Sequence, residues 1–270
     1  METRLPGIDA MLTTVAEHLY DHPKYYDLVF GSDWRAEFQF LTACFKQFST
    51  RRVRTLFEPA CGTGRLLFRL ARAGYCVAGN DLNPRAVDYC NRRLARHGFR
   101  PTAVVGDMAD FQLRRPVDAA FNLINSFRHL PTQEAAVGHL RCVSRALRPG
   151  GLFVLGLHLT PVAGVRCTEE SWSARRGHLA VNSRMWSTHV DQRRRREEVS
   201  MTFDIYTPRH QFRLTEEITF RTYTAVQMRR LLSDQKDLEL IDSFDFHYDI
   251  NHPVAVDAQT EDVIYVLRRR

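Results

Sequence analysis

Short apolar runs alternate with helical stretches between residues 53 and 157. The apolar runs predict strands at 53–57, 75–79, 103–105, 117–123 and 152–157. Between them, apolar residues recur at helical spacing over 65–72, 84–97 and 133–147. This alternation requires a parallel sheet with helices on both faces, so the pattern predicts a doubly wound α/β fold.

The pattern changes on either side of this region. Residues 8–19 and 33–49 carry apolar residues at helical spacing, and the segment 22–27 between them is turn-rich and aromatic. After residue 158, period-two alternation over about 178–221 predicts antiparallel strands. The remaining elements are a helix at 224–233 and strands at 238–246 and 262–267.

This organisation suggests three parts. We predict an N-terminal helical cap (1–50), a main α/β domain made of 51–160 and 222–270, and an antiparallel β insertion (161–221). The 270 residues are 44% hydrophobic, which is enough for a sizeable core. Two arginine runs, 193–196 and 268–270, hold much of the excess charge of +7. We interpret them as solvated surface; nucleic-acid binding is the alternative.

The cysteine spacing and the N-terminal sequence argue against a metal-binding, secreted or membrane-spanning protein. Six cysteines show no CxxC pair and no metal-ligand spacing, so we predict no metal site and a reducing compartment. The first residues lack the apolar core of a signal peptide, and no stretch is long enough to span a bilayer. We expect a cytoplasmic monomer or homodimer with no membrane partner.

The strongest chemical signal is the segment 58–64, which follows the first strand and opens the first helix. Its Gly62 and Gly64 allow a sharp turn and a close approach of backbone to a ligand. The third glycine of a dinucleotide fingerprint would fall at Leu67, so that motif is incomplete. A tight turn without a ligand remains an alternative.

Two further strand ends carry polar residues. Asp81 ends the second strand, where a carboxylate can accept hydrogen bonds from both ribose hydroxyls of a nucleoside. Gly106, Asp107 and Met108 follow the third strand and suit an adenine edge and face. An ordinary cap aspartate and a surface turn are the alternatives. Three such features at successive strand ends favour a nucleoside site.

These motifs resemble those of class I S-adenosylmethionine-dependent methyltransferases. The resemblance covers roughly 50–158 and includes Glu58xxxGly62xGly64, Asp81, the segment 106–108 and the segment 147–151. It implies a Rossmann-like, mainly parallel seven-stranded sheet, S-adenosyl-L-methionine as cofactor and methyl transfer by in-line displacement. The antiparallel insertion after the fifth strand is similar to that of small-molecule methyltransferases.

The resemblance also implies roles for individual residues. Glu58 would orient the glycine loop or the cofactor's amino group, and Ala60, Gly62 and Gly64 would present backbone to its methionine part. Asn125, after the fourth strand, would face the methionine part and the substrate entrance.

The adenosine half of the cofactor would contact other residues. Asp81 would hold the ribose with Leu82 against the adenine, and Asp107 and Met108 would bind the other adenine edge. The run Tyr25-Tyr26-Asp27 resembles members that close an N-terminal segment over the cofactor, which makes Tyr26 a candidate contact.

A general base is optional in this chemistry. His129 and His158 are the candidates, since both lie at strand ends that face the cofactor in this topology; structural histidines are the alternative. Tyr20 is a further candidate to cover the cofactor or substrate, and Trp172 and Trp186 could line an acceptor pocket or fill a core.

The leading hypothesis is methyl transfer to nitrogen or oxygen of a small molecule. An RNA or protein methyltransferase, a non-catalytic S-adenosylmethionine-binding protein and an NAD-dependent dehydrogenase are the alternatives. The segment 125–130 lacks the prolines of the motif that DNA-base amino methyltransferases carry there, which weakens a base-methylating function.

Overall fold

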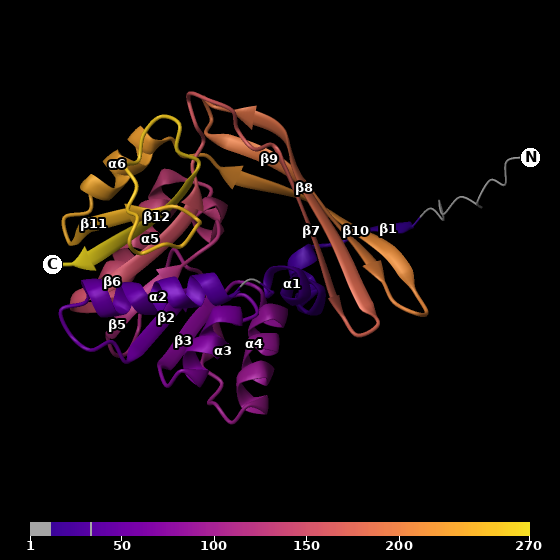
Figure 1. The fold of residues 1–270 in the computed structure, drawn as a ribbon, viewed down its shortest axis with the longest axis horizontal. Coiled ribbons are helices and arrows are strands. Elements are labelled where there is room, and N and C mark those ends of the chain that lie inside the picture. The colour runs from indigo at the N-terminus through magenta and orange to yellow at the C-terminus, as the bar shows by residue number, and fades with distance from the viewer. Residues whose placement is uncertain (1–11, 33) are drawn as a thin grey trace, which may run out of the picture.

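The larger of two sheets has seven strands and carries the fold. The computed structural model describes residues 12–32 and 34–270. The strand order is β11-β12-β6-β5-β2-β3-β4, in which only β12 runs antiparallel to its neighbours (Figure 1). The doubly wound, mainly parallel seven-stranded fold is confirmed. Its strands are β2 (Thr55–Pro59), β3 (Cys76–Asp81), β4 (Ala103–Val105), β5 (Val117–Asn122), β6 (Leu147–His158), β11 (Leu238–Phe244) and β12 (Asp262–Arg269).

Helices cover both faces of this main sheet because its strands are apolar on both sides. Leu56 and Phe57 point to opposite faces of β2 and are each at most 2% exposed. One core lies between the sheet and α2 (Trp34–Phe48), α3 (Arg65–Arg72) and α4 (Pro84–Arg96). The other core lies beneath α5 (Gln133–Ala146) and α6 (Ala225–Ser233).

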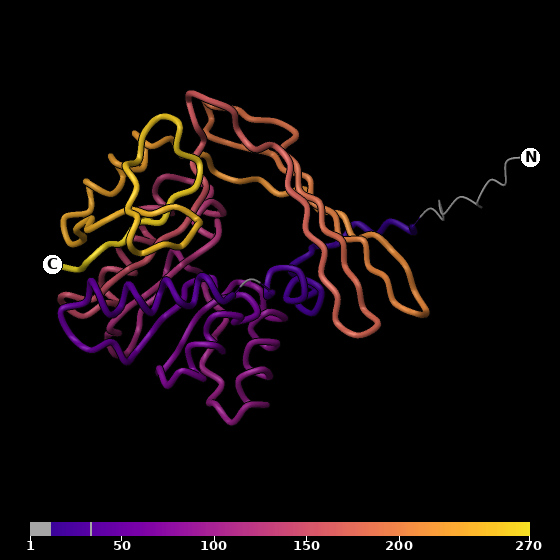
Figure 2. The backbone as a smooth tube through the Cα atoms, viewed as in Figure 1, coloured from indigo at the N-terminus to yellow at the C-terminus, as the bar shows by residue number. Residues whose placement is uncertain are grey.

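A second, five-stranded sheet stands beside the main sheet, and it has one apolar face and one largely polar face. Its order is β1-β10-β9-β8-β7. The apolar face packs on η1 (Leu19–Asp21) and α1 (Pro23–Phe30), so α1 lies between this sheet and α4 (Figures 1 and 2). The strands are β1 (Thr13–Ala16), β7 (Glu169–Arg176), β8 (Leu179–Asp191), β9 (Arg196–Tyr206) and β10 (Gln211–Arg221).

The structure corrects two predictions near the N-terminus. The helix expected over 8–19 is wrong where the chain is described, because residues 13–16 form β1 and pair in parallel with β10. Unpaired backbone groups at the edge of β10 outweigh the weak helical spacing there; residues 8–11 lie outside the described residues. The segment 22–27 is not a turn, since Pro23 occupies the first turn of α1.

Candidate active site

The turn after β2 brings backbone, not side chains, to the carboxyl edge of the main sheet. Ala60, Gly62 and Gly64 all have positive φ, at 52°, 52° and 65°. A Cβ at Gly64 would lie 2.2 Å from the Cys90 Sγ, whereas one at Gly62 would meet nothing within 4 Å. Gly64 is therefore required by packing against α4, and Gly62 faces open space.

Asp81 lies directly against this turn. Its Oδ2 accepts a hydrogen bond from the Gly62 N–H at 2.8 Å, and its Oδ1 accepts one from the Asn83 N–H at 2.9 Å. Burial raises the pKa of Asp81, and these two N–H donors lower it. The next residue, Leu82, leaves 67% of its surface exposed. The parallel pairing of β2 with β3 thus joins two motifs that are 17 residues apart.

The residues after β4 divide between surface and core. Asp107 is exposed, and its Oδ1 accepts a hydrogen bond from the Ala109 N–H at 2.7 Å. Met108 is only 7% exposed and packs in the core beneath α5. Its carbonyl is 2.9 Å from the Nδ1 of His139, a fully buried histidine whose pKa is lowered to about 4 by burial.

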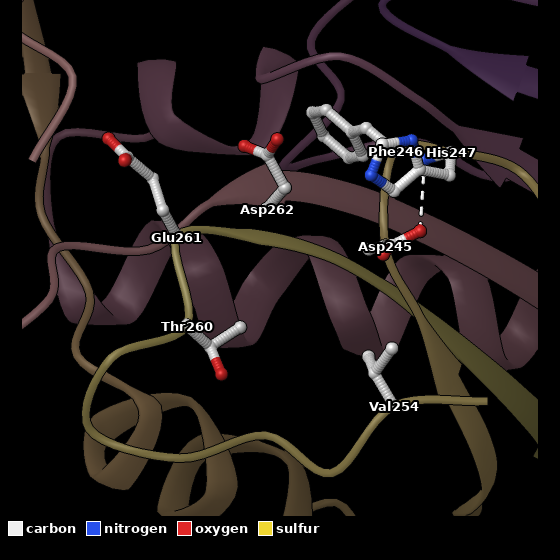
Figure 3. A pocket seen from close by; sticks show the side chains of 7 residues that line it. All are labelled: Asp245, Phe246, His247, Val254, Thr260, Glu261 and Asp262. Atoms are coloured by element: carbon white, nitrogen blue, oxygen red, sulfur yellow. Dashed lines mark hydrogen bonds between the residues drawn. The ribbon is translucent and has the colours of Figure 1, made fainter. Parts of the chain in front are cut away.

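Asn125 and His158 meet at the ends of β5 and β6. Asn125 has a φ of 65°, and its Oδ1 accepts a hydrogen bond from the His158 N–H at 2.8 Å. The His158 Nδ1 lies 2.6 Å from the Asp262 Oδ1. Asp262 and Phe246 line a cavity of about 340 Å³, which Figure 3 shows from close by. The Phe246 ring also packs against His158, with 5.0 Å between centroids.

His129 has a different environment, at the end of η2 (Ser126–His129). Its Nε2 is 3.1 Å from the Tyr20 hydroxyl, and its ring packs against Phe220 of β10 at 4.8 Å. Burial, followed by the charge of Arg128, lowers the pKa of His129 to about 4. His129 therefore joins the main sheet to the second sheet and is neutral at neutral pH.

Asp27 of α1 reaches the glycine turn, and Tyr26 precedes it on the same helix. The Tyr26 ring packs against Tyr20 at 5.3 Å, and burial raises its pKa to about 12. Asp27 is 2% exposed; it accepts hydrogen bonds from the Thr63 hydroxyl at 3.1 Å and forms an ion pair with Arg93 of α4. Sequence reasoning noted the run around Tyr26 but missed Asp27 as the residue that anchors α1.

Arg65, at the start of α3, is held by a second buried carboxylate. Its two terminal nitrogens donate to both oxygens of Glu37, at 2.7 and 2.6 Å. Glu37 was also missed, although it stands on the apolar stripe of α2 beside Phe38 and Leu41, where an unpaired charge would be costly. A charged residue on an apolar stripe was the available signal.

Glu58 lies close to this pair without joining it. The residue is 8% exposed, and its Oε2 has no hydrogen-bond partner among the described residues. Burial raises the pKa of Glu58 well above its usual range, and the Arg65 guanidinium lowers it in part. Among residues 12–32 and 34–270, no group of side chains suits a metal ion, and no helix has the length and apolar character to cross a membrane.

The comparison with known families agrees with this geometry. Residues 57–151 match a protein-family profile described as a methyltransferase domain. The matched residues include the glycine turn, Asp81 and Asn125, so the predicted resemblance to class I S-adenosylmethionine-dependent methyltransferases is confirmed over this segment.

Several relatives of the matched segment are named as N,N-dimethyltransferases of dTDP-amino sugars. The dTDP-3-amino-3,4,6-trideoxy-alpha-D-glucopyranose N,N-dimethyltransferase of Streptomyces venezuelae is 29% identical over 140 residues, which are 50% of this chain and 56% of that protein. The chain thus spans about half the length of such curated relatives.

Solved structures share the fold over nearly the whole chain. An S-adenosylmethionine-dependent methyltransferase from Clostridium acetobutylicum has a TM-score of 0.73 at 18% identity, over 93% of this chain and 99% of that one. The amino pentose methyltransferase CalS10 from Micromonospora echinaspora, solved with S-adenosylmethionine bound, has a TM-score of 0.71 at 18% identity, over 95% and 98%.

Proposed function

We propose that this protein is an S-adenosyl-L-methionine-dependent methyltransferase that transfers a methyl group to a nitrogen of a small molecule. The observation that carries the proposal is the contact between the Asp81 carboxylate and the Gly62 N–H, at 2.8 Å. It joins a ribose-binding carboxylate to an open backbone turn at the edge where such folds bind nucleosides.

The residues around this contact suit both halves of the cofactor. Each oxygen of Asp81 accepts one backbone N–H, and because a carboxylate oxygen can accept two hydrogen bonds, each is still able to accept a ribose hydroxyl. The exposed Leu82 offers an apolar surface to the adenine, with Asp107 at its edge. Gly62 and the unpartnered Oε2 of Glu58 suit the methionine carboxylate and ammonium.

When bound, the sulfonium supplies an activated methyl group and a neutral leaving group, so this chain has mainly to orient the acceptor and exclude water. Tyr20 and Tyr26 of the N-terminal segment, whose rings pack on each other, would cover the bound cofactor. Asn125 follows β5 and His158 ends β6, and these are the two strands beyond β2. His158 is therefore roughly 10 Å from the glycine turn across the sheet, because adjacent strands are about 4.8 Å apart.

An amine acceptor is protonated at neutral pH and must lose a proton before its lone pair can react. His129 is poorly suited to accept that proton because its pKa is lowered to about 4 by burial and Arg128. His158 has the Asp262 carboxylate on Nδ1, which fixes the ring with Nε2 as the proton acceptor. We assign proton acceptance to His158 and orientation of the acceptor to the pair Tyr20–His129.

The positions of the C-terminal arginines favour a small acceptor over nucleic acid. Arg268 donates to the Phe48 carbonyl and lies opposite Leu152, near the start of β6. Asp262 of the same strand lies opposite His158, at the other end of β6. The C-terminal arginines therefore lie at the edge of the sheet away from the site and form no basic stripe beside it.

The first test is cofactor binding. S-adenosylhomocysteine should raise the melting temperature by mass action, and NAD should not. Asp81→Ala should weaken S-adenosylhomocysteine binding by about 1–3 kcal/mol in titration calorimetry, the range for a charge-assisted hydrogen bond. Asp88→Ala, which removes an exposed carboxylate on α4, is the control and should leave affinity unchanged. An Asp81→Ala protein with wild-type affinity would contradict the ribose assignment.

The second test is the acceptor. With labelled cofactor, dTDP-amino sugars should be methylated in preference to phenols, peptides and tRNA. Preferential labelling of tRNA or a peptide would replace the small-molecule assignment with the macromolecular alternative.

A further inference from the structure

Glu58 is a buried carboxyl group without a counter-charge of its own. Its side chain is buried, its Oε2 has no hydrogen-bond partner among the described residues, and the Arg65 guanidinium is the cation that lowers its pKa. Arg65 already donates to both oxygens of Glu37, with side-chain exposures of 15% and 3% for the two partners. One cation thus faces two carboxyl groups, and the hydrogen bonds go to Glu37.

The other groups that face Glu58 oppose its ionisation. They include Glu37 of α2, Cys90 of α4 and Asp81 at the end of β3. The carboxylates of Glu37 and Asp81 would place negative charge near a carboxylate at position 58, and burial removes water that would otherwise stabilise that charge. The protonated form of Glu58 is therefore more stable than its carboxylate until another cation binds beside it.

The cofactor carries such a cation. The amino group in the methionine part of S-adenosylhomocysteine is an ammonium near neutral pH, and the glycine turn begins two residues after Glu58. We propose that Glu58 is protonated in the cofactor-free protein and gives up this proton to solvent when the ligand's ammonium binds beside its Oε2. This inference rests on the proposed function, and it makes cofactor binding a proton-releasing reaction.

The release of a proton from Glu58 determines how ligand affinity changes with pH. The ammonium keeps its protons, Glu58 loses one, and the buffer takes it up, so binding is stronger at higher pH while free Glu58 is still protonated. Release of one full proton would increase affinity by about tenfold per pH unit. The affinity becomes independent of pH once Glu58 is ionised in the free protein.

Titration calorimetry with S-adenosylhomocysteine tests the coupling. We would measure the binding enthalpy of the full chain at pH 6.5 in phosphate and in Tris, whose ionisation enthalpies differ, and obtain the number of protons released. The wild type should release a substantial fraction of one proton, and Glu58→Gln, which cannot ionise, should release none. Asp88→Asn, which neutralises an exposed carboxylate on α4 outside the proposed site, is the control and should keep the release.

An infrared difference spectrum tests protonation without any ligand. Subtracting cofactor-free Glu58→Gln from cofactor-free wild type should show the carbonyl stretch of a protonated carboxylic acid. Absence of that band, or equal proton release by wild type and Glu58→Gln, overturns the proposal. If the band is present but S-adenosylhomocysteine does not bind the wild type, both the proposed function and the coupling are wrong. If S-adenosylhomocysteine binds without proton release, only the coupling is wrong.

Discussion

The main sheet and the second sheet contribute different kinds of contact to the candidate site. At the main sheet, backbone groups fix the functional side chains: the Gly62 N–H holds Asp81, and the His158 N–H holds Asn125. At the second sheet, contact is made by side chains. Phe220 of β10 packs on His129, and Glu197 of β9, which is 3% exposed, pairs with Arg128 of η2 and with Arg166.

This difference indicates how such a protein can change its acceptor without losing its cofactor. Strand order and turn geometry set the positions of Gly62 and Asp81, so they follow from the fold itself. If the acceptor binds beside His129, as proposed, its site would depend on individual side chains such as Phe220 and Glu197, which belong to the second sheet. Three substitutions test whether the two regions are separable in this way.

His158→Gln should have the largest effect. If the ring accepts a proton from the acceptor, its loss should reduce turnover by about 10²–10⁴-fold, the usual contribution of a general base. Affinity for S-adenosylhomocysteine, measured by calorimetry, should not change, because the backbone contact to Asn125 remains. His129→Gln is the comparison variant and should mainly raise KM for the acceptor. The reverse result, with turnover lost in His129→Gln, would reassign the proton acceptor.

Glu197→Gln should cost stability but not cofactor binding. It would leave Arg128 and Arg166 without their shared carboxylate, and breaking a buried ion pair typically costs about 3–5 kcal/mol. The free energy of unfolding in urea measures this. Glu169→Gln removes an exposed pair with Arg184 in the same sheet and should cost less than about 1 kcal/mol. A large loss of cofactor affinity in Glu197→Gln would show that the regions are coupled.

Gly64→Ala should have a smaller effect on stability. The new Cβ would overlap the Cys90 Sγ, which costs about 1–3 kcal/mol, and a φ of 65° adds about 1–2 kcal/mol. Gly74→Ala isolates the second contribution, since its φ is 93° and a Cβ there meets nothing within 4 Å. Thermal unfolding should rank the two variants in that order, and equal losses would mean that α4 moves to accommodate the methyl group.

Predictions from the sequence were correct where the local residue pattern and the tertiary contacts favour the same structure. The glycine turn, Asp81 and Asn125 lie at the carboxyl ends of their strands as predicted, because strand-to-helix turns of a parallel sheet place such residues on one edge. It failed at Thr13–Ala16, where pairing with β10 decides the conformation, and at Pro23–Phe30, where aromatic residues and a proline suggested a turn. Both segments contact the second sheet, and such long-range contacts are not described by a local pattern.

The amino-acid pattern alone determined the doubly wound sheet, its strand ends and the residues around the glycine turn, because apolar periodicity and turn chemistry are local properties. Only the tertiary structure decided which side chains form ion pairs and hydrogen bonds with each other. Asp262 is 104 residues from the histidine it contacts, and Glu37 is 28 residues from Arg65. Such partners are chosen by strand register and burial, which no spacing along the chain encodes.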